Sequence, residues 1–331
     1  MFTQPPELSD DDVARAVSDG WGVAVDALAY APVGFGSHHW HATAGGERWF
    51  VTVDDLEAKR WEAGEPLSGP RDRLASALDM ARRLRAGGLA FVVAPIATRA
   101  GASTKPLGDR WVVSLYEHVD GDGHPWGAYP DRASRLAVLD LVARTHAAPA
   151  AVWAGARRDE MRLPHRAGLD AVLDGDTRPW GPGPFAEPAR ALVAGHAPAV
   201  RAALARHDRL AAAARGRPER MVLTHGEPHR ANTMTTPAGP VLIDWETALM
   251  APPERDLWSM AAEDDRIPQD YAARTGVEPD PDALALYRLG WDLTEVAGYA
   301  DLYRRPHAET EDTAHAWGYF EGYLEAVSSA R

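Results

Sequence analysis

The sequence predicts an α+β protein with two lobes, a β-rich N-terminal lobe over residues 1–117 and a mostly helical C-terminal lobe over residues 118–331. Three observations lead to this prediction. The chain has 331 residues, which is more than one small module needs and enough for two lobes. Short strand-like segments separated by glycine-containing turns dominate the first 117 residues. Apolar residues at helical spacing dominate the remainder.

The N-terminal lobe is expected to open with a helix over 8–19, because acidic residues follow a candidate cap at Ser9 and Gly20 can end the helix. A second helix is expected over 71–85, ending at Gly87-Gly88. The remaining segments read as short strands, mostly in an antiparallel meander. These strands are expected at 21–30, 37–44, 48–53, 91–96 and 110–117.

The C-terminal lobe is expected to be mostly helical with one small hairpin. Its helices are expected at 132–146, 163–173, 188–214, 282–302 and 313–328. Short strands are expected at 221–224, 232–235 and 240–245, and the turn TPAG joins the last two.

Composition excludes several classes of protein. The chain has no cysteine, which excludes disulfides, thiolate metal sites, iron–sulfur clusters and cysteine nucleophiles. No apolar run approaches the ~20 residues that a membrane span needs, and the start lacks the pattern of a secretory signal, so a cytoplasmic location is expected.

Charge narrows the expected partners. The chain carries 35 basic and 48 acidic residues, a formal net charge of -13, which argues against nucleic acid and against an anionic membrane. Residues 250–331 contain 17 acidic and 7 basic residues, so most of the net charge lies in this segment. A cationic small molecule is compatible with this distribution, although solvated helix faces would give the same pattern.

The segment 224–245, THGEPHRANTMTTPAGPVLIDW, holds the most informative polar side chains. Glu227 can accept the proton of a hydroxyl group. Asn232 and Asp244 offer an amide and a carboxylate oxygen, the hard ligands that Mg²⁺ prefers. Such a set is what transfer of a phosphoryl group from ATP needs.

This segment also resembles a known family. HGEPHRAN at 225–232 is similar to the HGDxHxxN catalytic loop of the aminoglycoside phosphotransferase and choline kinase superfamily. The runs IDW at 243–245 and APPERDL at 251–257 resemble the IDW…P…DL segment of the same superfamily. Within it, the chain is most similar to spectinomycin phosphotransferases, through its length, the runs LTHG and LMAPPERDL, and Tyr287-Arg288, Thr294-Glu295 and Tyr299. The resemblance implies a protein-kinase-like fold and an ATP- (or GTP-) and Mg²⁺-dependent O-phosphotransferase.

The resemblance also implies roles for single residues. Glu227 stands at the position of the catalytic base, and Asn232 and Asp244 at those of the magnesium ligands. His225 stands where a histidine supports the loop, and Asp256 would be structural, bonding that loop.

The nucleotide would be bound by the N-terminal lobe and the segment that follows it. Gly34-Phe35-Gly36-Ser37 resembles the loop that covers the triphosphate, where backbone N–H groups can meet phosphate oxygens. The main-chain groups of Glu117 and Val119 stand where the family holds the edge of adenine.

Two positions depart from the family pattern. Glu227 replaces an aspartate, and its extra methylene carries the carboxylate ~1.5 Å further. Thr52 stands on the third strand where the family has a phosphate-binding lysine, and a hydroxyl cannot supply that charge. The sequence leaves open what replaces the lysine: Lys59, Arg48, or a histidine of His38, His39 and His41. Asp72 or Asp79 on the next helix is a candidate partner for the replacing cation.

The acceptor is expected to be a cationic antibiotic, an aminoglycoside or aminocyclitol such as spectinomycin, whose phosphorylation confers resistance. Carboxylates and tryptophans of the C-terminal lobe are the candidate acceptor contacts. They are Glu263, Asp264, Asp265, Trp291, Asp292 and Glu295. A monomer is expected.

The same residues are compatible with other interpretations. The chain could be a kinase of the same fold for choline, homoserine or a sugar, or a kinase-like protein that binds a ligand without catalysis, with Thr52 and Glu227 as marks of lost activity. A zinc site at His225 and His229 is disfavoured, because Gly226 and Pro228 oppose the helix that would place both imidazoles on one face.

Overall fold

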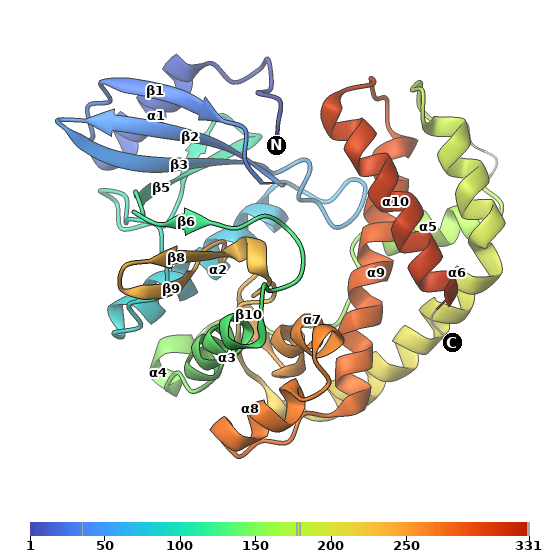
Figure 1. Cartoon of the computed structure of the whole chain (residues 1–331). Coiled ribbons are helices and arrows are strands. Elements are labelled where there is room, and N and C mark those ends of the chain that lie inside the picture. Colours follow the sequence, from blue (N-terminus) through green and yellow to red (C-terminus); the bar gives the residue numbers. More distant parts are fainter. Residues whose placement is uncertain (35, 177, 179, 330–331) are drawn as a thin grey trace. The chain divides into compact units, whose positions relative to one another are not determined.

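The computed structural model describes residues 1–34, 36–176, 178 and 180–329 (Figure 1). The chain forms two compact units. The first unit comprises Met1–Lys59, Leu67–Asp159 and Glu219–Asp280, and the second comprises Arg60–Pro66, Glu160–Pro218 and Pro281–Arg331. Each unit has a hydrophobic core of its own.

A five-stranded antiparallel sheet lies in the first unit (Figure 1). Its strands, in spatial order, are β1 (Ala27–Ala31), β2 (Ser37–Ala44), β3 (Glu47–Asp55), β5 (Trp111–Glu117) and β4 (Lys105–Leu107). Alternate residues of the central strands, among them Trp40, Val51, Val53 and Val113, are buried against helix α1 (Asp10–Trp21). The same alternation places Thr52 on the opposite face, paired with His39 on β2 and Ser114 on β5.

The helices of the N-terminal region follow the sequence closely, with one correction. The Ser9 hydroxyl caps α1 by accepting the backbone N–H of Asp12, as expected. Gly20 does not end this helix: it is buried inside the helix, and Gly22, at φ 77°, forms the left-handed cap. Helix α2 (Ser68–Ala86) ends at Gly87, as expected.

Two expected strands are wrong in whole or in part. Residues 21–26 do not belong to β1, because Trp21 completes α1 and its indole Nε1 donates to the Ile96 carbonyl at 2.9 Å. Residues 91–96 form a loop with a single bridge, Val92 to Leu242, although they are apolar. Burial explains their apolar character here, and a short buried segment reads like a strand in a sequence.

The rest of the first unit contains short elements around the candidate site. Its helices are α3 (Arg132–His146), α4 (Ala150–Trp153), α7 (Glu254–Glu263) and α8 (Ile267–Thr275). Two small sheets join β6 (Asp122–Gly123), β8 (Thr233–Thr236) and β9 (Gly239–Leu242), and β7 (Val222–Thr224) with β10 (Leu249–Ala251). β10, α7 and α8 are too short to show a clear periodicity, so no element is predicted at these positions.

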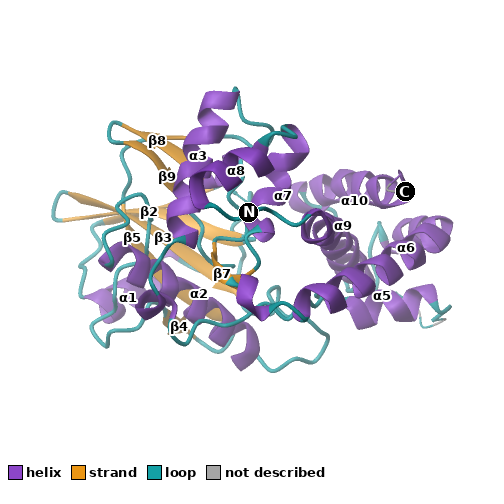
Figure 2. Ribbon diagram, turned by 90° about the horizontal axis from the view of Figure 1, so that it is seen from below, coloured by secondary structure: helices purple, strands orange, loops and turns teal. Residues whose placement is uncertain are grey.

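The second unit is helical (Figure 2). Helices α5 (Arg166–Leu173), α6 (Ala186–Arg215), α9 (Pro281–Arg304) and α10 (Glu311–Ser329) pack around a core that includes Val193, Leu204, Leu293 and Phe320. Over the described residues, every helix is too short or too polar to cross a membrane.

Candidate active site

The loop between β7 and β8 is anchored from the interior of the first unit. Asp256, on α7, accepts the backbone N–H groups of His225 at 2.9 Å and Gly226 at 2.6 Å. Its carboxylate also lies 3.0 Å from Nε2 of His146, and all of these groups are buried or nearly so. Burial is the largest single influence and would raise the pKa of Asp256, but His146, His225 and Arg255 together outweigh it and lower the pKa. Asp256 therefore holds the loop, the role expected for it.

His225 fixes the start of the loop with both ring nitrogens. Its Nδ1 accepts the Glu227 backbone N–H at 3.2 Å, and its Nε2 donates to the Ile243 carbonyl at 2.9 Å. Only the neutral tautomer with the proton on Nε2 satisfies both contacts. Burial lowers the pKa of His225 to about 4, so the ring stays neutral at pH 7.

This depressed pKa predicts an acid-sensitive component of stability. Between pH 6.5 and about 4 the unfolded chain protonates at His225 while the folded chain does not, so the free energy of unfolding falls as the pH falls through this window. We expect His225 to account for about 3 kcal/mol of this loss. Urea unfolding of the wild type and of His225→Gln at several pH values measures it. The other histidines are common to both proteins. If the free energy of unfolding depends on pH equally in both proteins between pH 6.5 and about 4, the prediction is contradicted.

Gly226 has a conformation and a position that only glycine tolerates. Its φ is 102°, in the left-handed region. A Cβ there would lie 2.4 Å from Nη1 of Arg255 and 2.5 Å from Oγ1 of Thr247. The Arg255 guanidinium is itself fixed, because it donates to Thr224 Oγ1 at 2.9 Å and to the Thr247 carbonyl at 3.0 Å.

Glu227 and Asn232 lie close together at the two ends of the loop. The Asn232 amide Nδ2 donates to the Glu227 carbonyl at 3.0 Å and lies 3.2 Å from Nε2 of His229. Since Nδ2 donates to the Glu227 carbonyl, the oxygen Oδ1 on the other side of the amide points away from that carbonyl and can serve as a ligand. Burial would raise the pKa of Glu227, but His229, the larger of the opposing influences, and Arg255 lower it, so the carboxylate is ionised at neutral pH.

Asp244 follows β9 in a strained conformation. Its φ is 62°, which is uncommon for a residue other than glycine and is found often at functional sites. Burial, together with the charges of Glu246 and Glu227, raises the pKa of Asp244 well above its usual value. These surroundings therefore disfavour the ionised form of the Asp244 carboxylate, which a bound cation would stabilise.

Lys59, one of the candidates to replace the missing lysine, lies among carboxylates of the first unit. Its Nζ lies 2.5 Å from Oε2 of Glu246 and 3.2 Å from Oδ1 of Asp54. Only 18% of the Lys59 side chain is exposed, so the ammonium points into the first unit. Burial alone would lower the pKa of Lys59, but Glu246 and then Asp54 overcome it and raise the pKa.

Two other candidates for this cation, Arg48 and His39, are engaged elsewhere or uncharged. Arg48 pairs with Asp120. Burial lowers the pKa of His39 to about 4, and its Nδ1 lies 3.3 Å from the Thr52 hydroxyl, so the ring is neutral. The proposed partner Asp79 accepts from Ser103 and Arg82 instead of from the cation.

Sequence reasoning missed Asp54 and Glu246. The available signal was a carboxylate two residues after Asp244 in IDWE and another at the end of the third strand. Asp54 accepts from the Ser37 hydroxyl at 2.6 Å, and a Cβ on Gly36 would lie 4.0 Å from Oε1 of Glu246. The turn that holds Gly34 (φ 68°) and Gly36 (φ 89°) therefore lies next to Lys59, Asp54 and Glu246, which we call the Lys59 cluster. Phe35 lies outside the described residues.

The donor chemistry fits Mg²⁺. Asn232 Oδ1 and the Asp244 carboxylate are hard oxygen ligands, and Glu246 interacts electrostatically with Asp244. Four carboxylates, Asp54, Glu227, Asp244 and Glu246, share this region with one lysine ammonium. Over the described part of the chain, no group of three or more His, Asp or Glu residues forms a metal cage. Mg²⁺ needs none, since one or two protein ligands and substrate phosphates hold it.

Glu117 and Val119, whose main-chain groups are expected to hold the edge of adenine, lie where the sheet ends. Glu117 is the last residue of β5 and pairs with Trp49. The His118 N–H donates to the Arg48 carbonyl at 3.3 Å, and the chain leaves the sheet at Val119.

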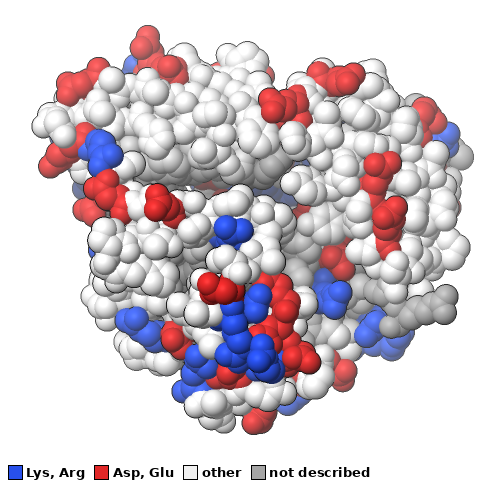
Figure 3. Space-filling view, viewed as in Figure 1, with Lys and Arg blue, Asp and Glu red and all other residues white. Residues whose placement is uncertain are grey.

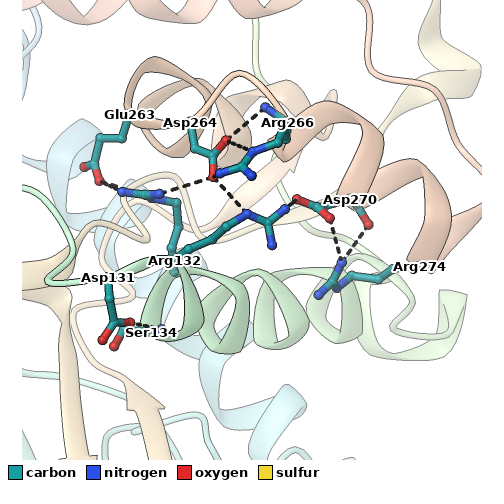
Figure 4. A network of polar contacts seen from close by, with 9 residues as sticks. Asp131, Arg132, Ser134, Glu263, Asp264, Arg266, Asp270 and Arg274 are labelled. Carbon is teal, nitrogen blue, oxygen red and sulfur yellow. Dashed lines mark hydrogen bonds and ion pairs between the residues drawn. The ribbon is translucent and has the colours of Figure 1, made fainter.

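In the first unit, two of the expected acceptor contacts are engaged by arginines (Figure 4). Arg135 contacts Glu263 at 2.7 Å, and Arg132 and Arg266 contact Asp264 at 3.1 and 2.8 Å. The hydrogen bond from Arg266 lowers the pKa of Asp264 to about 2. Figure 3 shows basic and acidic side chains interleaved on the face around α7 and α8. We therefore assign Glu263 and Asp264 a structural role.

Asp265 is exposed beside these residues. Its carboxylate stays a candidate contact.

In the second unit, the remaining candidates lie on α9 among tyrosines. The Trp291 indole donates to the Tyr323 hydroxyl at 3.1 Å, and the rings of Tyr323 and Tyr299 stack at 6.3 Å. Burial raises the pKa of Asp292 to about 6, and Glu295 hydrogen-bonds Tyr299. Asp292 and Glu295 are three residues apart and share one face of the helix.

Comparison with known proteins places this geometry in context. The phosphotransferase enzyme family matches residues 30–297. Protein StrN of Streptomyces griseus is 30% identical over 260 residues, which cover 75% of this chain and 76% of that protein. Among solved structures, spectinomycin phosphotransferase APH(9)-Ia, in complex with ADP and spectinomycin, is similar with a TM-score of 0.71 and 14% identity, over 98% of each chain. The microcompartment-associated aminopropanol kinase has a TM-score of 0.57 and 16% identity, over 96% of each chain. The expected α+β, protein-kinase-like fold is confirmed.

Proposed function

Because this chain belongs to the phosphotransferase enzyme family and acts on hydroxyl groups, we propose that it transfers the γ-phosphoryl group of ATP (or GTP) to a cationic small molecule. The acceptor class that we propose is an aminoglycoside or aminocyclitol antibiotic such as spectinomycin, and its phosphorylation would confer resistance. The observation that carries the proposal is the Lys59 ammonium, held by Asp54 and Glu246 beside the glycine-containing turn.

The nucleotide is bound through charge and main-chain groups. We propose that Lys59 supplies the positive charge for the phosphates, and that the N–H groups of Gly34, Gly36 and Ser37 donate to phosphate oxygens. Thr52 lies on β3 and contributes no charge to this binding. The main-chain groups of Glu117 and Val119 are proposed to hydrogen-bond the edge of adenine.

The reacting groups need only positioning and neutralisation of charge. Glu227 accepts the proton of the acceptor hydroxyl group. The hydroxyl oxygen of the acceptor then bonds to the γ-phosphorus. At the same time the bond between the γ-phosphorus and the β,γ-bridging oxygen breaks, and the nucleoside diphosphate leaves. His225 stays neutral and holds the loop. Asn232 and Asp244 would hold Mg²⁺, which, when bound, neutralises the charge on the phosphate oxygens.

The acceptor is proposed to contact Trp291, Asp292 and Glu295, with Asp265 as a further candidate. Carboxylates among aromatic rings suit a molecule that carries ammonium groups on a sugar-like ring. The net charge of -13 also favours the approach of such a cation.

The test is transfer of labelled γ-phosphate from Mg-ATP and Mg-GTP to spectinomycin, several aminoglycosides, choline, homoserine and aminopropanol. Transfer to an antibiotic supports the proposal. Transfer to choline, homoserine or aminopropanol alone would assign a metabolite kinase instead. Nucleotide binding without transfer to any acceptor would favour a protein that binds its ligand without catalysis.

A further inference from the structure

The Tyr129 hydroxyl contacts the loop between β7 and β8 one residue after the proposed base. It donates to the Pro228 carbonyl at 2.6 Å, although 99 residues separate the two positions in the chain. Both residues are buried. Proline has no N–H group, so its carbonyl is the one main-chain group at position 228 that can form a hydrogen bond. A buried carbonyl needs a donor, and the Tyr129 hydroxyl is that donor.

Tyr129 is itself held by charged side chains. Its N–H donates to Oε2 of Glu263 at 3.1 Å, and Nη2 of Arg135 donates to the same oxygen at 2.7 Å. The Arg135 guanidinium also lies 5.9 Å from the centre of the Tyr129 ring, within the range of a cation–π contact. Burial, followed by the charge of Glu263, raises the pKa of Tyr129, so the hydroxyl keeps its proton at neutral pH. The donor is therefore presented to the loop by a residue whose backbone and ring are both fixed.

The neighbouring hydrogen bonds of this segment are exposed to solvent. Nη1 of Arg230 donates to the Ala128 carbonyl at 3.3 Å, and Nε2 of His124 lies 3.0 Å from the Thr235 hydroxyl. Water competes for exposed groups, so these contacts constrain the backbone weakly. The hydrogen bond of Tyr129 is buried and shorter, so we expect it to constrain the loop more than they do.

Glu227 lies between this hydrogen bond and one made by Asp256. On the N-terminal side of Glu227, Asp256 accepts the Gly226 N–H at 2.6 Å. On its C-terminal side, Tyr129 holds the Pro228 carbonyl. With both neighbours held, the Cα–Cβ bond of Glu227 has a fixed direction, and only its side-chain torsions can vary.

Building on the proposed function, we propose that Tyr129 is a positioning residue for phosphoryl transfer, which fixes the backbone from which the Glu227 carboxylate reaches the acceptor hydroxyl. Tyr129 acts through the Pro228 carbonyl rather than by contact with the substrate. Glu263 and Arg135 support it, because they hold Tyr129 in place. Glu263, which the sequence predicts to contact the acceptor, thus serves the loop instead.

The test begins with Tyr129→Phe, which keeps the ring in the core and removes the hydroxyl alone. We expect kcat to fall by about 10-fold or more, because a misplacement of about 1 Å costs up to about 100-fold. KM for Mg-ATP should change less than about 2-fold, because the Lys59 cluster lies outside this set of contacts. An unchanged kcat would overturn the inference.

Tyr303→Phe separates positioning from stability. Tyr303 is a buried tyrosine of the second unit, and its hydroxyl also donates to a main-chain carbonyl, that of Thr313, at 2.8 Å. Both substitutions should lower Tm, since each removes the hydrogen bond of a buried hydroxyl. Only Tyr129→Phe should lower kcat. Equal losses of kcat in the two variants would trace the effect to stability and overturn the inference.

A Glu227→Ala background tests whether Tyr129 acts through Glu227. Loss of the proposed base should lower kcat by about 100-fold or more and leave a turnover that labelled phosphate can detect. With no carboxylate to position, Tyr129→Phe should change this remaining kcat less than about 2-fold. The same loss in the wild-type and Glu227→Ala backgrounds would contradict the inference.

Hydrogen–deuterium exchange judges the contact without any activity. In Tyr129→Phe, the N–H groups of residues 227–232 should exchange about 10-fold faster or more, because the loop opens more readily without its hydrogen bond. In Tyr303→Phe they should exchange as in the wild type. Unchanged exchange in Tyr129→Phe would overturn the inference. If the wild type phosphorylates no acceptor, the proposed function fails, and exchange still decides whether Tyr129 holds the loop.

Discussion

Asp244→Asn is expected to reduce phosphoryl transfer by about 10³-fold or more and to leave the protein at least as stable as the wild type. Asparagine keeps the size of the side chain and tolerates the left-handed backbone at φ 62°, whereas alanine would add strain there. The carboxylate, however, is buried next to Glu246 and Glu227, and these surroundings raise its pKa. Removing the charge relieves that repulsion and removes a proposed magnesium ligand.

Two measurements on the same variant check this prediction. Steady-state kinetics with Mg-ATP gives the loss of kcat, and thermal unfolding gives the change in Tm. Mg²⁺ with nucleotide should raise the Tm of the wild type much more than that of Asp244→Asn, because only the wild type binds the metal well. Asp19→Asn, at an exposed position of α1, is the matched control. Retained turnover would refute the assignment of Asp244.

Lys59→Met is expected to lower kcat/KM for the nucleotide by about 100-fold or more and to destabilise the fold. The methionine removes the charge proposed to bind the phosphates. It also leaves Asp54 and Glu246, with 2% and 25% of their side chains exposed, without their counter-ion. Breaking a buried ion pair on one side costs about 3–5 kcal/mol. The sign is the opposite of that for Asp244→Asn, where a surplus negative charge is removed.

The chain offers a precise control, since Lys105 is its only other lysine. Lys105→Met, on β4, should leave kcat/KM unchanged. Lys59→Arg keeps the charge and should retain part of the activity.

Should Lys59→Met fail to fold, chemical labelling of the wild type replaces the variant. A lysine-reactive acyl phosphate of ATP should acylate Lys59 and spare Lys105. Excess ATP should protect Lys59, and equal labelling of both lysines would contradict its assignment to the phosphates.

Local sequence predicted the elements and motifs whose signal is contiguous. Helix α3 has the expected bounds, residues 132–146, because its apolar spacing and its flanking residues agree. The segments around Glu227, Asn232 and Asp244 could be recognised because each lies within a few residues of a distinctive pattern. The apolar run at 91–96 predicts a strand but forms a loop, because a short buried segment is apolar in either conformation.

The sequence by itself determined the α+β class and the order of most elements. It also determined which loop is proposed for catalysis, and that Thr52 has no charge where the resembling family has a lysine. Only the tertiary structure decided which cation occupies that region. Lys59 and Glu246 are 187 residues apart, and a pair so distant in the chain leaves no local pattern. The same holds for Asp264, whose neutralisation by Arg132 depends on how α3 packs near α7. Electrostatic partners are chosen by proximity in space, and that proximity exists only after the chain has folded.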